Sequence, residues 1–169
     1  QKARDFSSLG QTLLSRLGQH TSLAQGSLYL ADSSTRSLQL ARGYARGEAP
    51  TDPPPAIAFG TGLLGQCALE MREMRLDTPG AGYLQTPSAL AVARPALVWL
   101  IPVINNDSLL GVLEIALLAP LTAAEESLVN ELLPTLALCM EILERDADTQ
   151  RLLAETRQQA VALQENEKR

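Results

Sequence analysis

Residues 97–118 read LVWLIPVINNDSLLGVLEIALL and form the most continuous apolar run in this 169-residue chain. The run is interrupted once, at residues 105–108, which read Asn-Asn-Asp-Ser. These residue types leave extended structure readily, because their side chains bond the local backbone and because asparagine and aspartate tolerate positive φ. The stretch therefore predicts a β-hairpin with its turn at these four residues.

Alternation assigns two faces to this hairpin, since successive strand side chains point to opposite sides of a sheet. One face is apolar throughout and consists of Leu97, Trp99, Ile101, Val103, Leu113, Ile115 and Leu117. The other face carries smaller side chains, a proline and a carboxylate, and consists of Val98, Leu100, Pro102, Val112, Glu114 and Ala116. We expect helices to cover the first face, and we interpret the second as the floor of a partly polar cavity.

Glu114 stands in mid-strand between apolar neighbours, where an ionised carboxylate must find a hydrogen-bond donor or change its pKa. Two interpretations stay open. Antiparallel sheets commonly have one wet face, which would make Glu114 an outward-facing charge on a solvated strand. Alternatively, it is a cavity group that meets a donor from a ligand or from Arg94.

The composition indicates one domain with a hydrophobic core, since 46% of the residues are hydrophobic. The net charge of −5 and the lack of any Lys/Arg-rich block argue against nucleic acid and against direct membrane contact. No apolar run reaches the ~20 residues of a membrane span. Cys67 and Cys139 are too few for a disulfide framework or a zinc site, so we expect a cytoplasmic location.

The chain starts at Gln1 and both of its ends have a helical pattern, so we expect it to be a piece of a longer protein that could itself be membrane-anchored. An amphipathic helix is predicted over residues 2–19, because Phe6, Leu9, Leu13 and Leu17 recur at helical spacing. The elements that we expect next are a hairpin over 27–31 and 37–44, a proline-rich connector over 46–55, a helix over 63–72, a strand over 74–77, and a long loop over 79–95 with a helical turn around 88–92.

A capping box at Thr122 and Glu125 predicts the start of the last helix. Its apolar positions keep a spacing of three and four residues and are Leu128, Leu132, Leu136, Cys139 and Leu143. Beyond residue 145 the composition becomes polar, and two heptad-like registers compete there. One register contains Leu152, Thr156, Gln159 and Leu163, and the other contains Leu153, Arg157, Ala160 and Gln164.

Chemical motifs are few. Gly60, Gly62 and Gly65 satisfy G-x-G-x-x-G, but too short a strand precedes them and Asp77 follows too early for the ribose contact of a dinucleotide site. We therefore interpret the glycines as a structural turn that leads into a helix. His20 is the only histidine and fits a solvated helix end, so the sequence predicts no metal site, no cofactor and no catalytic constellation.

Three segments together resemble a GAF domain. They are residues 60–67 (GTGLLGQC), the central hairpin with Pro102 and Gly111, and the closing helix over 121–143. The polar tail and the loop before the hairpin are similar to GAF modules N-terminal to the kinase core of bacterial hybrid sensor histidine kinases, although Ala89 and Ala91 replace expected glycines. Neither a cyclic-nucleotide signature nor a chromophore-attachment pattern is recognisable, and a methionine-sulfoxide-reductase GAF domain would need more reactive cysteines.

The resemblance implies an α+β, GAF-like (profilin-like) fold, with a central antiparallel sheet of five or six strands, terminal helices on one face and a small-molecule pocket on the other. It assigns residues 1–145 to a sensor domain and 146–169 to a signalling helix that leads to an output domain. The ligand-binding residues that it implies are Tyr29, Phe59, Leu64, Tyr83, Leu84, Val98, Leu100, Glu114 and Ala116.

The implied function is that of a non-catalytic module that senses an unknown small molecule and relays the signal to a histidine kinase in the same chain, through a parallel homodimer. The dimer helices would contribute Phe6, Leu13, Leu136, Cys139, Leu143 and Leu152. Three alternatives stay open. The domain could be a ligand-free dimerisation spacer or a small redox enzyme that uses Cys67 and Cys139, or its output could be a cyclase or phosphatase.

Overall fold

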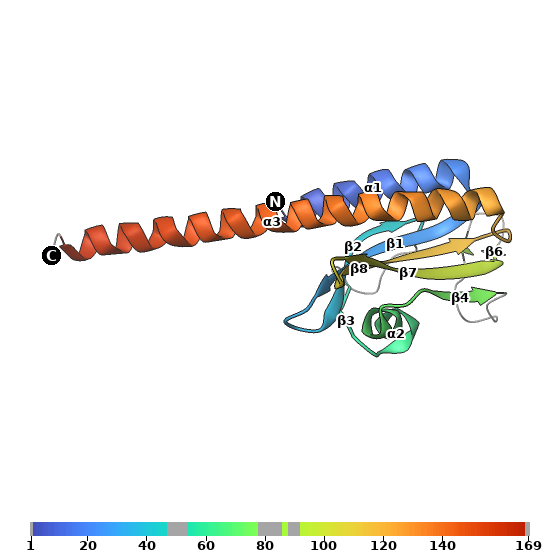
Figure 1. The fold of residues 1–169 in the computed structure, drawn as a ribbon, viewed down its shortest axis with the longest axis horizontal. Coiled ribbons are helices and arrows are strands. Elements are labelled where there is room, and N and C mark those ends of the chain that lie inside the picture. Colours follow the sequence, from blue (N-terminus) through green and yellow to red (C-terminus); the bar gives the residue numbers. More distant parts are fainter. Residues whose placement is uncertain (1, 47–53, 78–85, 88–91, 168–169) are drawn as a thin grey trace.

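The computed structural model describes residues 2–46, 54–77, 86–87 and 92–167. A six-stranded antiparallel sheet in the order β3-β2-β1-β8-β7-β4 has α1 and α3 side by side on one face and α2 on the other (Figure 1). This arrangement confirms the predicted α+β fold. The elements are α1 (Lys2–His20), β1 (Leu23–Asp32), β2 (Ser37–Tyr44), β3 (Ile57–Ala58), α2 (Gly62–Glu70), β4 (Met74–Asp77), β5 (Thr86–Pro87), β6 (Val92–Ala93), β7 (Leu97–Asn105), β8 (Ser108–Leu117) and α3 (Ala123–Glu167).

The predicted central hairpin is confirmed as β7 and β8, which pair from Leu97 with Leu117 to Asn105 with Ser108. Its two loop residues have positive φ, 48° at Asn106 and 60° at Asp107. A two-residue loop with two positive φ angles matches the right-handed twist of the strands. Since β8 also pairs with β1 and β7 with β4, this hairpin forms the middle of the sheet.

The apolar face of the hairpin packs under α1 and α3, as alternation predicted. Trp99 is fully buried there, and its neighbours in the same core include Phe6 of α1 and Met140 of α3. Burial of such large apolar side chains is the main stabilising contribution in a domain of this size. The helices are therefore held to the sheet by residues that the sequence pattern already separates from the opposite face.

The opposite face is partly filled by α2, which places Cys67 and Ala68 against Val98, Leu100 and Val112 of the hairpin. All five of these residues are buried. This second core covers the β7 side of the face. A cavity on this face is therefore confined to the β1 side, beside the first turn of α2.

Several expected boundaries change. β1 begins at Leu23, four residues before the predicted strand, because its ladder with β8 extends to Leu117. α2 ends at Glu70, followed by Met71 with φ of 51°, and is shorter than the predicted helix over 63–72. Residues 88–91 of the predicted helical turn lie outside the described residues, and its last residue, Val92, is in a strand that pairs with β5.

The last helix, α3, is 45 residues long, or about 68 Å at 1.5 Å per residue. Its capping box is confirmed: the Glu125 amide donates to Thr122 Oγ1 at 3.2 Å, and the Thr122 amide donates to Glu125 Oε2 at 2.8 Å. The helix runs beyond the sheet, and residues 151–164 are all exposed. None of the helices in the described part of the chain has the length and hydropathy needed to cross a membrane.

Candidate functional site

A cavity of about 260 Å³ opens on the α2 face of the sheet. β1 and β8 form its floor, the start of α2 and β3 contribute one wall, and a residue that follows β2 contributes another. Its lining residues are Gln25, Gly26, Ser27, Tyr29, Arg46, Ile57, Leu64, Glu114 and Ala116. The cavity thus combines an acid, a base and hydroxyl groups with apolar walls, which is the usual composition of a small-molecule site.

The strand register brings the polar groups of the floor together. Ser27 of β1 lies directly opposite Glu114 of β8, and Tyr29 follows two residues along β1 on the same face. Ser27 and Tyr29 are 2% and 4% exposed, respectively. The two hydroxyl groups and the carboxylate therefore lie on one surface of the sheet and face the same space.

Arg46 reaches this floor because the chain reverses just after β2. Ala45 has a φ of 52°, in the left-handed region, and Gly43 has no side chain to block the return. A Cβ at Gly43 would lie 2.7 Å from Arg46 Cδ. Arg46 Nη1 then donates to Ser27 Oγ at 3.0 Å and to Tyr29 Oη at 2.7 Å. The guanidinium is fixed at the side of the cavity by two hydroxyl acceptors.

Glu114 gives the cavity its electrostatic character. Burial raises the pKa of its carboxyl group, and the nearby charge of Arg46 offsets part of that increase. The pKa of Tyr29 is also raised, first by burial and then by the charge of Glu114. Within the described residues, no donor lies at hydrogen-bonding or ion-pairing distance from the Glu114 carboxylate. Its oxygens remain available to accept a hydrogen bond from a molecule in the cavity.

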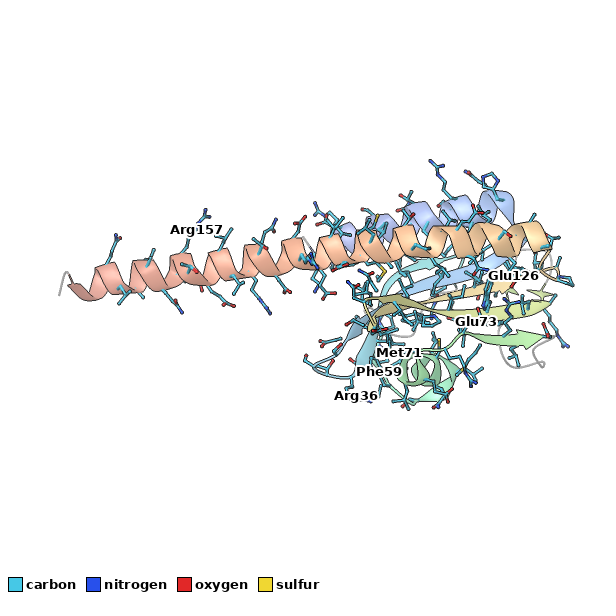
Figure 2. The ribbon with its side chains drawn as sticks, viewed as in Figure 1. Arg36, Phe59, Met71, Glu73, Glu126 and Arg157 are labelled. Carbon is cyan, nitrogen blue, oxygen red and sulfur yellow. The ribbon has the colours of Figure 1, made fainter. Side chains whose placement is uncertain are left out.

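The structure brings four of the predicted ligand-binding residues together around the cavity: Tyr29, Leu64, Glu114 and Ala116. Val98 and Leu100 point to the same face but are buried under α2. Phe59 packs at the edge of that second core, with the Arg36 guanidinium 5.6 Å from its ring centroid (Figure 2). The remaining two predicted residues, Tyr83 and Leu84, lie outside the described residues.

Sequence reasoning missed five lining residues: Gln25, Gly26, Ser27, Arg46 and Ile57. Ser27 shares the parity of Tyr29 along β1 and could have been found from alternation. Arg46 was assigned to an exposed connector, and Arg94 was considered as the partner of Glu114. Arg46 and Arg94 are both exposed, but it is Arg46 whose charge acts on Glu114. The backbone reversal at Ala45, together with the space left by Gly43 and the hydroxyl acceptors on β1, explains this difference.

The residues predicted for the dimer helices occupy different environments. Phe6 and Leu136 are 1% and 4% exposed and belong to the core between the helices and the sheet. Leu13, Cys139 and Leu143 are half-buried. Leu152, in the projecting part of α3, is exposed. Phe6 and Leu136 therefore already have packing partners within one protomer. The burial of these six residues does not test whether the protein dimerises.

A larger groove, of about 560 Å³, lies where α3 leaves the domain, near the tips of both hairpins. Its rim carries exposed charged side chains, including the ion pair between Lys2 Nζ and Glu144 Oε1 at 3.2 Å. Size alone does not indicate function, and this groove contains no buried ionisable group. Within the described residues, no cluster of three or more metal-binding side chains is present in any part of the fold.

Sequence comparison identifies the family. The sequence model of a GAF domain family matches residues 3–141, so the chain belongs to the GAF domain family. GAF domains are in general signalling or sensing modules. The match extends from the start of α1 to the middle of α3 and therefore includes the sheet, the cavity and the covering helices. None of the curated proteins matches the chain.

Solved structures support the same fold. The GAF domain/HD domain protein of Geobacter sulfurreducens is 20% identical, with a TM-score of 0.65 over 84% of this chain and 95% of that one. The GAF domain of a two-component sensor histidine kinase from Bacillus halodurans is 15% identical, with a TM-score of 0.65 over 83% and 96%. Free methionine-R-sulfoxide reductase from Neisseria meningitidis is 21% identical, with a TM-score of 0.59 over 85% and 81%. At these identities the similarity establishes the fold alone.

Proposed function

We propose that this GAF domain senses a small molecule in the Glu114 cavity and relays its binding to an output domain, in a bacterial signalling protein of the sensor histidine kinase type. The observation that carries the proposal is a cavity of about 260 Å³ that is lined by two opposite charges. The half-buried Glu114 carboxylate has no hydrogen-bond donor among the described residues, and two hydroxyl groups hold the Arg46 guanidinium near it. The domain itself is non-catalytic in this proposal, needs no cofactor and works in the cytoplasm.

The chemistry of the walls specifies the ligand in outline. Glu114 requires a hydrogen-bond donor, because an ionised carboxylate only accepts. Arg46 uses Nη1 for two hydroxyl groups and keeps other N–H donors for a ligand acceptor. Leu64, Ile57 and Ala116 provide apolar contact. The expected ligand is a small polar molecule that carries both a donor and an acceptor group.

A thermal-shift screen tests ligand binding directly, since a ligand that binds only the folded state raises stability by mass action. The panel should contain small amines, amino acids, carboxylates and purine bases. A compound that stabilises the wild-type chain should lose most of its effect in Glu114→Gln and in Tyr29→Phe. Glu73→Gln, a carboxylate outside the cavity, is the matched control. If no compound acts, or if the control loses the effect equally, the ligand-free spacer function is favoured instead.

The proposed relay runs from the cavity floor to α3. β8 carries Glu114 on the cavity face and Ile115 and Leu113 on the face that packs beneath the helices, so a ligand that moves β8 also changes helix packing. α3 would carry this change to the output domain in a parallel homodimer. Analytical ultracentrifugation of the chain, with and without ligand, measures the dimer. Autophosphorylation of the full-length protein, compared between wild type and Glu114→Gln, measures the output; a cyclase or phosphatase output would show no phosphohistidine.

A redox enzyme is the competing function, because methionine sulfoxide reductases share this fold. Cys67 argues against it. The side chain is fully buried under the sheet, and burial together with Glu70 and Glu73 raises the pKa of its thiol to about 12. A thiol with so high a pKa forms almost no nucleophilic thiolate at neutral pH. Reductase activity that disappears in Cys67→Ser would support the enzyme and contradict the sensor.

A further inference from the structure

An apolar groove of about 270 Å³ opens between the two helices that cover the sheet. α1 contributes Leu9, Thr12, Leu13 and Arg16 to its lining, and α3 contributes Leu132, Thr135, Leu136 and Cys139. Because Leu136 is 4% exposed and packs in the core beneath the helices, the α3 residues that a partner could contact are Leu132, Thr135 and Cys139. These α3 residues follow a spacing of three and four. That spacing defines one face of the helix, and it can be continued beyond the domain.

When this spacing is continued toward the C-terminus of α3, it selects residues at alternating steps of three and four. We call this set the outer stripe. It consists of Leu132, Thr135, Cys139, Ile142, Asp146, Thr149, Leu153, Thr156, Ala160 and Leu163. Neither of the two registers suggested by the sequence contains this set, since the outer stripe takes Thr156 and Leu163 from one and Leu153 and Ala160 from the other. The groove favours the outer stripe, because Thr135 is exposed in it whereas Leu136, which would continue into the register with Leu153 and Ala160, is buried in the core.

The exposed apolar side chains of α3 lie mainly on the outer stripe or directly beside it. Six large apolar side chains of this helix are exposed: Leu138, Ile142, Leu152, Leu153, Val161 and Leu163. Three of them lie on the outer stripe. Leu138 and Leu152 border it, each one residue before a stripe position, and only Val161 lies off this face. Apolar side chains gathered on one face of a surface helix indicate a binding partner.

Among the described residues, the projecting part of α3 has no packing partner within its own protomer. Residues 151–164 are exposed on every side, and side chains such as Arg157 point into solvent (Figure 2). An isolated helix of this length is only marginally stable in water, because helices in proteins depend on packing. The stripe therefore needs a second helix that matches it along its whole length.

We propose that the partner is a second copy of this chain, parallel to the first, with outer stripe packed against outer stripe. This inference rests on the proposed relay dimer and specifies its interface. A parallel copy sets each stripe residue opposite itself, with flanking residues paired five positions apart. Arg145 then faces Gln150 of the other copy, Leu152 faces Arg157, and Gln159 faces Gln164, so no like charges meet at these flanking positions. The register with Leu152 and Gln159 in the seam would instead set Glu141 opposite Asp146, and the register with Leu153 and Ala160 would bury Arg157.

Asp146 is the only charged residue on the outer stripe, and in the parallel dimer it faces Asp146 of the other copy. Two carboxylates at one seam position repel each other and lose solvent. The stripe is therefore weakest where α3 leaves the domain. Asp146→Leu should tighten the dimer by at least about tenfold in Kd. This increase in dimer affinity could not result from a destabilised fold, because destabilisation would weaken the dimer.

Disulfide cross-linking identifies the register. In a Cys139→Ser background, Thr156→Cys, Ala160→Cys and Ala162→Cys are prepared one at a time in the 169-residue chain and oxidised with copper phenanthroline. A disulfide forms only when the two Cα atoms are within about 7 Å, as they are at seam positions alone. The remaining native cysteine, Cys67, is buried and does not interfere. Ala160 and Ala162 are matched in size and exposure.

The outer stripe predicts that Thr156→Cys and Ala160→Cys both give covalent dimers, whereas Ala162→Cys stays monomeric on a non-reducing gel. If only Thr156→Cys cross-links, the seam follows the register that contains Leu152 and Thr156. If only Ala160→Cys cross-links, the seam follows the register that contains Leu153 and Ala160. Either result overturns the outer stripe but leaves the proposed dimer intact. A chain that sediments as a monomer at high concentration overturns the proposed dimer itself.

Discussion

Arg46 Nη1 lies 2.7 Å from Tyr29 Oη, and this hydrogen bond joins the chain just after β2 to the middle of β1 across the cavity. The same nitrogen donates to Ser27 Oγ at 3.0 Å. Two neutral acceptors thus hold the guanidinium next to Glu114 without neutralising it. The fold therefore fixes the positive charge of Arg46 near the cavity. The effect of this charge can be measured through the pKa of Glu114.

Replacement of Arg46 should change the titration of Glu114. Burial raises the pKa of Glu114 and the charge of Arg46 offsets part of the increase, so Arg46→Met should raise that pKa further. Methionine keeps most of the side-chain length but has no charge. Carbon-13 NMR of labelled glutamate carboxyl groups measures the effect. Arg36→Met, on the turn that precedes β2, is the control and should leave the Glu114 titration unchanged.

The pH dependence of stability should reflect the same carboxylate. The folded-state pKa of Glu114 lies above the value of 4.5 expected for an unperturbed group, so the folded state retains this proton when the unfolded chain has released it. The stability contribution is therefore complete below about pH 4.5 and is lost as the pH rises through the folded-state value. Each unit of upward shift corresponds to about 1.4 kcal/mol.

Glu114→Gln removes this titration but keeps the shape of the side chain. Urea denaturation between pH 4 and pH 8 should show that the variant gains stability relative to wild type as the pH rises. Glu70→Gln is a suitable control, because Glu70 is exposed and its pKa is lowered by Gln66 and Arg72. The expected pH trend for Glu70 has the opposite sign. A wild-type minus Glu114→Gln difference that does not vary with pH would contradict the electrostatic account of the cavity.

Local sequence patterns were sufficient to predict the central hairpin, the amphipathic first helix and the two-faced sheet. Asn106 and Asp107 favour a tight turn by their own chemistry, and the alternation from Leu97 to Val103 depends only on strand geometry. Part of the cavity floor was predicted for the same reason, because Glu114 and Ala116 follow from parity along one strand, whereas Tyr29 was expected only from the resemblance to GAF domains. Such features are encoded within a few residues of one another.

Arg46 shows where this kind of inference fails. Its approach to the cavity requires a left-handed residue at Ala45, a missing side chain at Gly43, and acceptors on a neighbouring strand. None of these conditions is visible from the residues that flank Arg46. Likewise, the placement of Val98 and Leu100 under α2 depends on where that helix docks, which is a tertiary property. Sequence parity gave the correct face but could not divide it between core and cavity.

Gly111 of β8 pairs with Leu30 of β1 and has no room for a side chain, so its replacement should be strongly destabilising. A Cβ at this position would lie 2.1 Å from the Tyr29 carbonyl oxygen and 2.9 Å from Met140 Cε. The first contact is with backbone and cannot be relieved by a rotamer change. Gly111→Ala should cost roughly 2–4 kcal/mol in urea denaturation. Gly62→Ala meets no atom within 4 Å and should cost only about 1 kcal/mol, through its φ of 62°.

The capping box sets the stability of the first turn of α3. Glu125 Oε2 accepts from both the amide and the hydroxyl of Thr122, at 2.8 Å and 2.9 Å, and Thr122 Oγ1 accepts from the Glu125 amide. Thr122→Ala removes the side-chain cap and should lower the free energy of unfolding by about 0.5–2 kcal/mol. Thr12→Ala is the matched control, because Thr12 lies inside α1, where alanine is the better helix former. Thermal or urea denaturation should therefore show a loss at residue 122 and no loss at residue 12, and equal losses at the two sites would contradict a specific capping role.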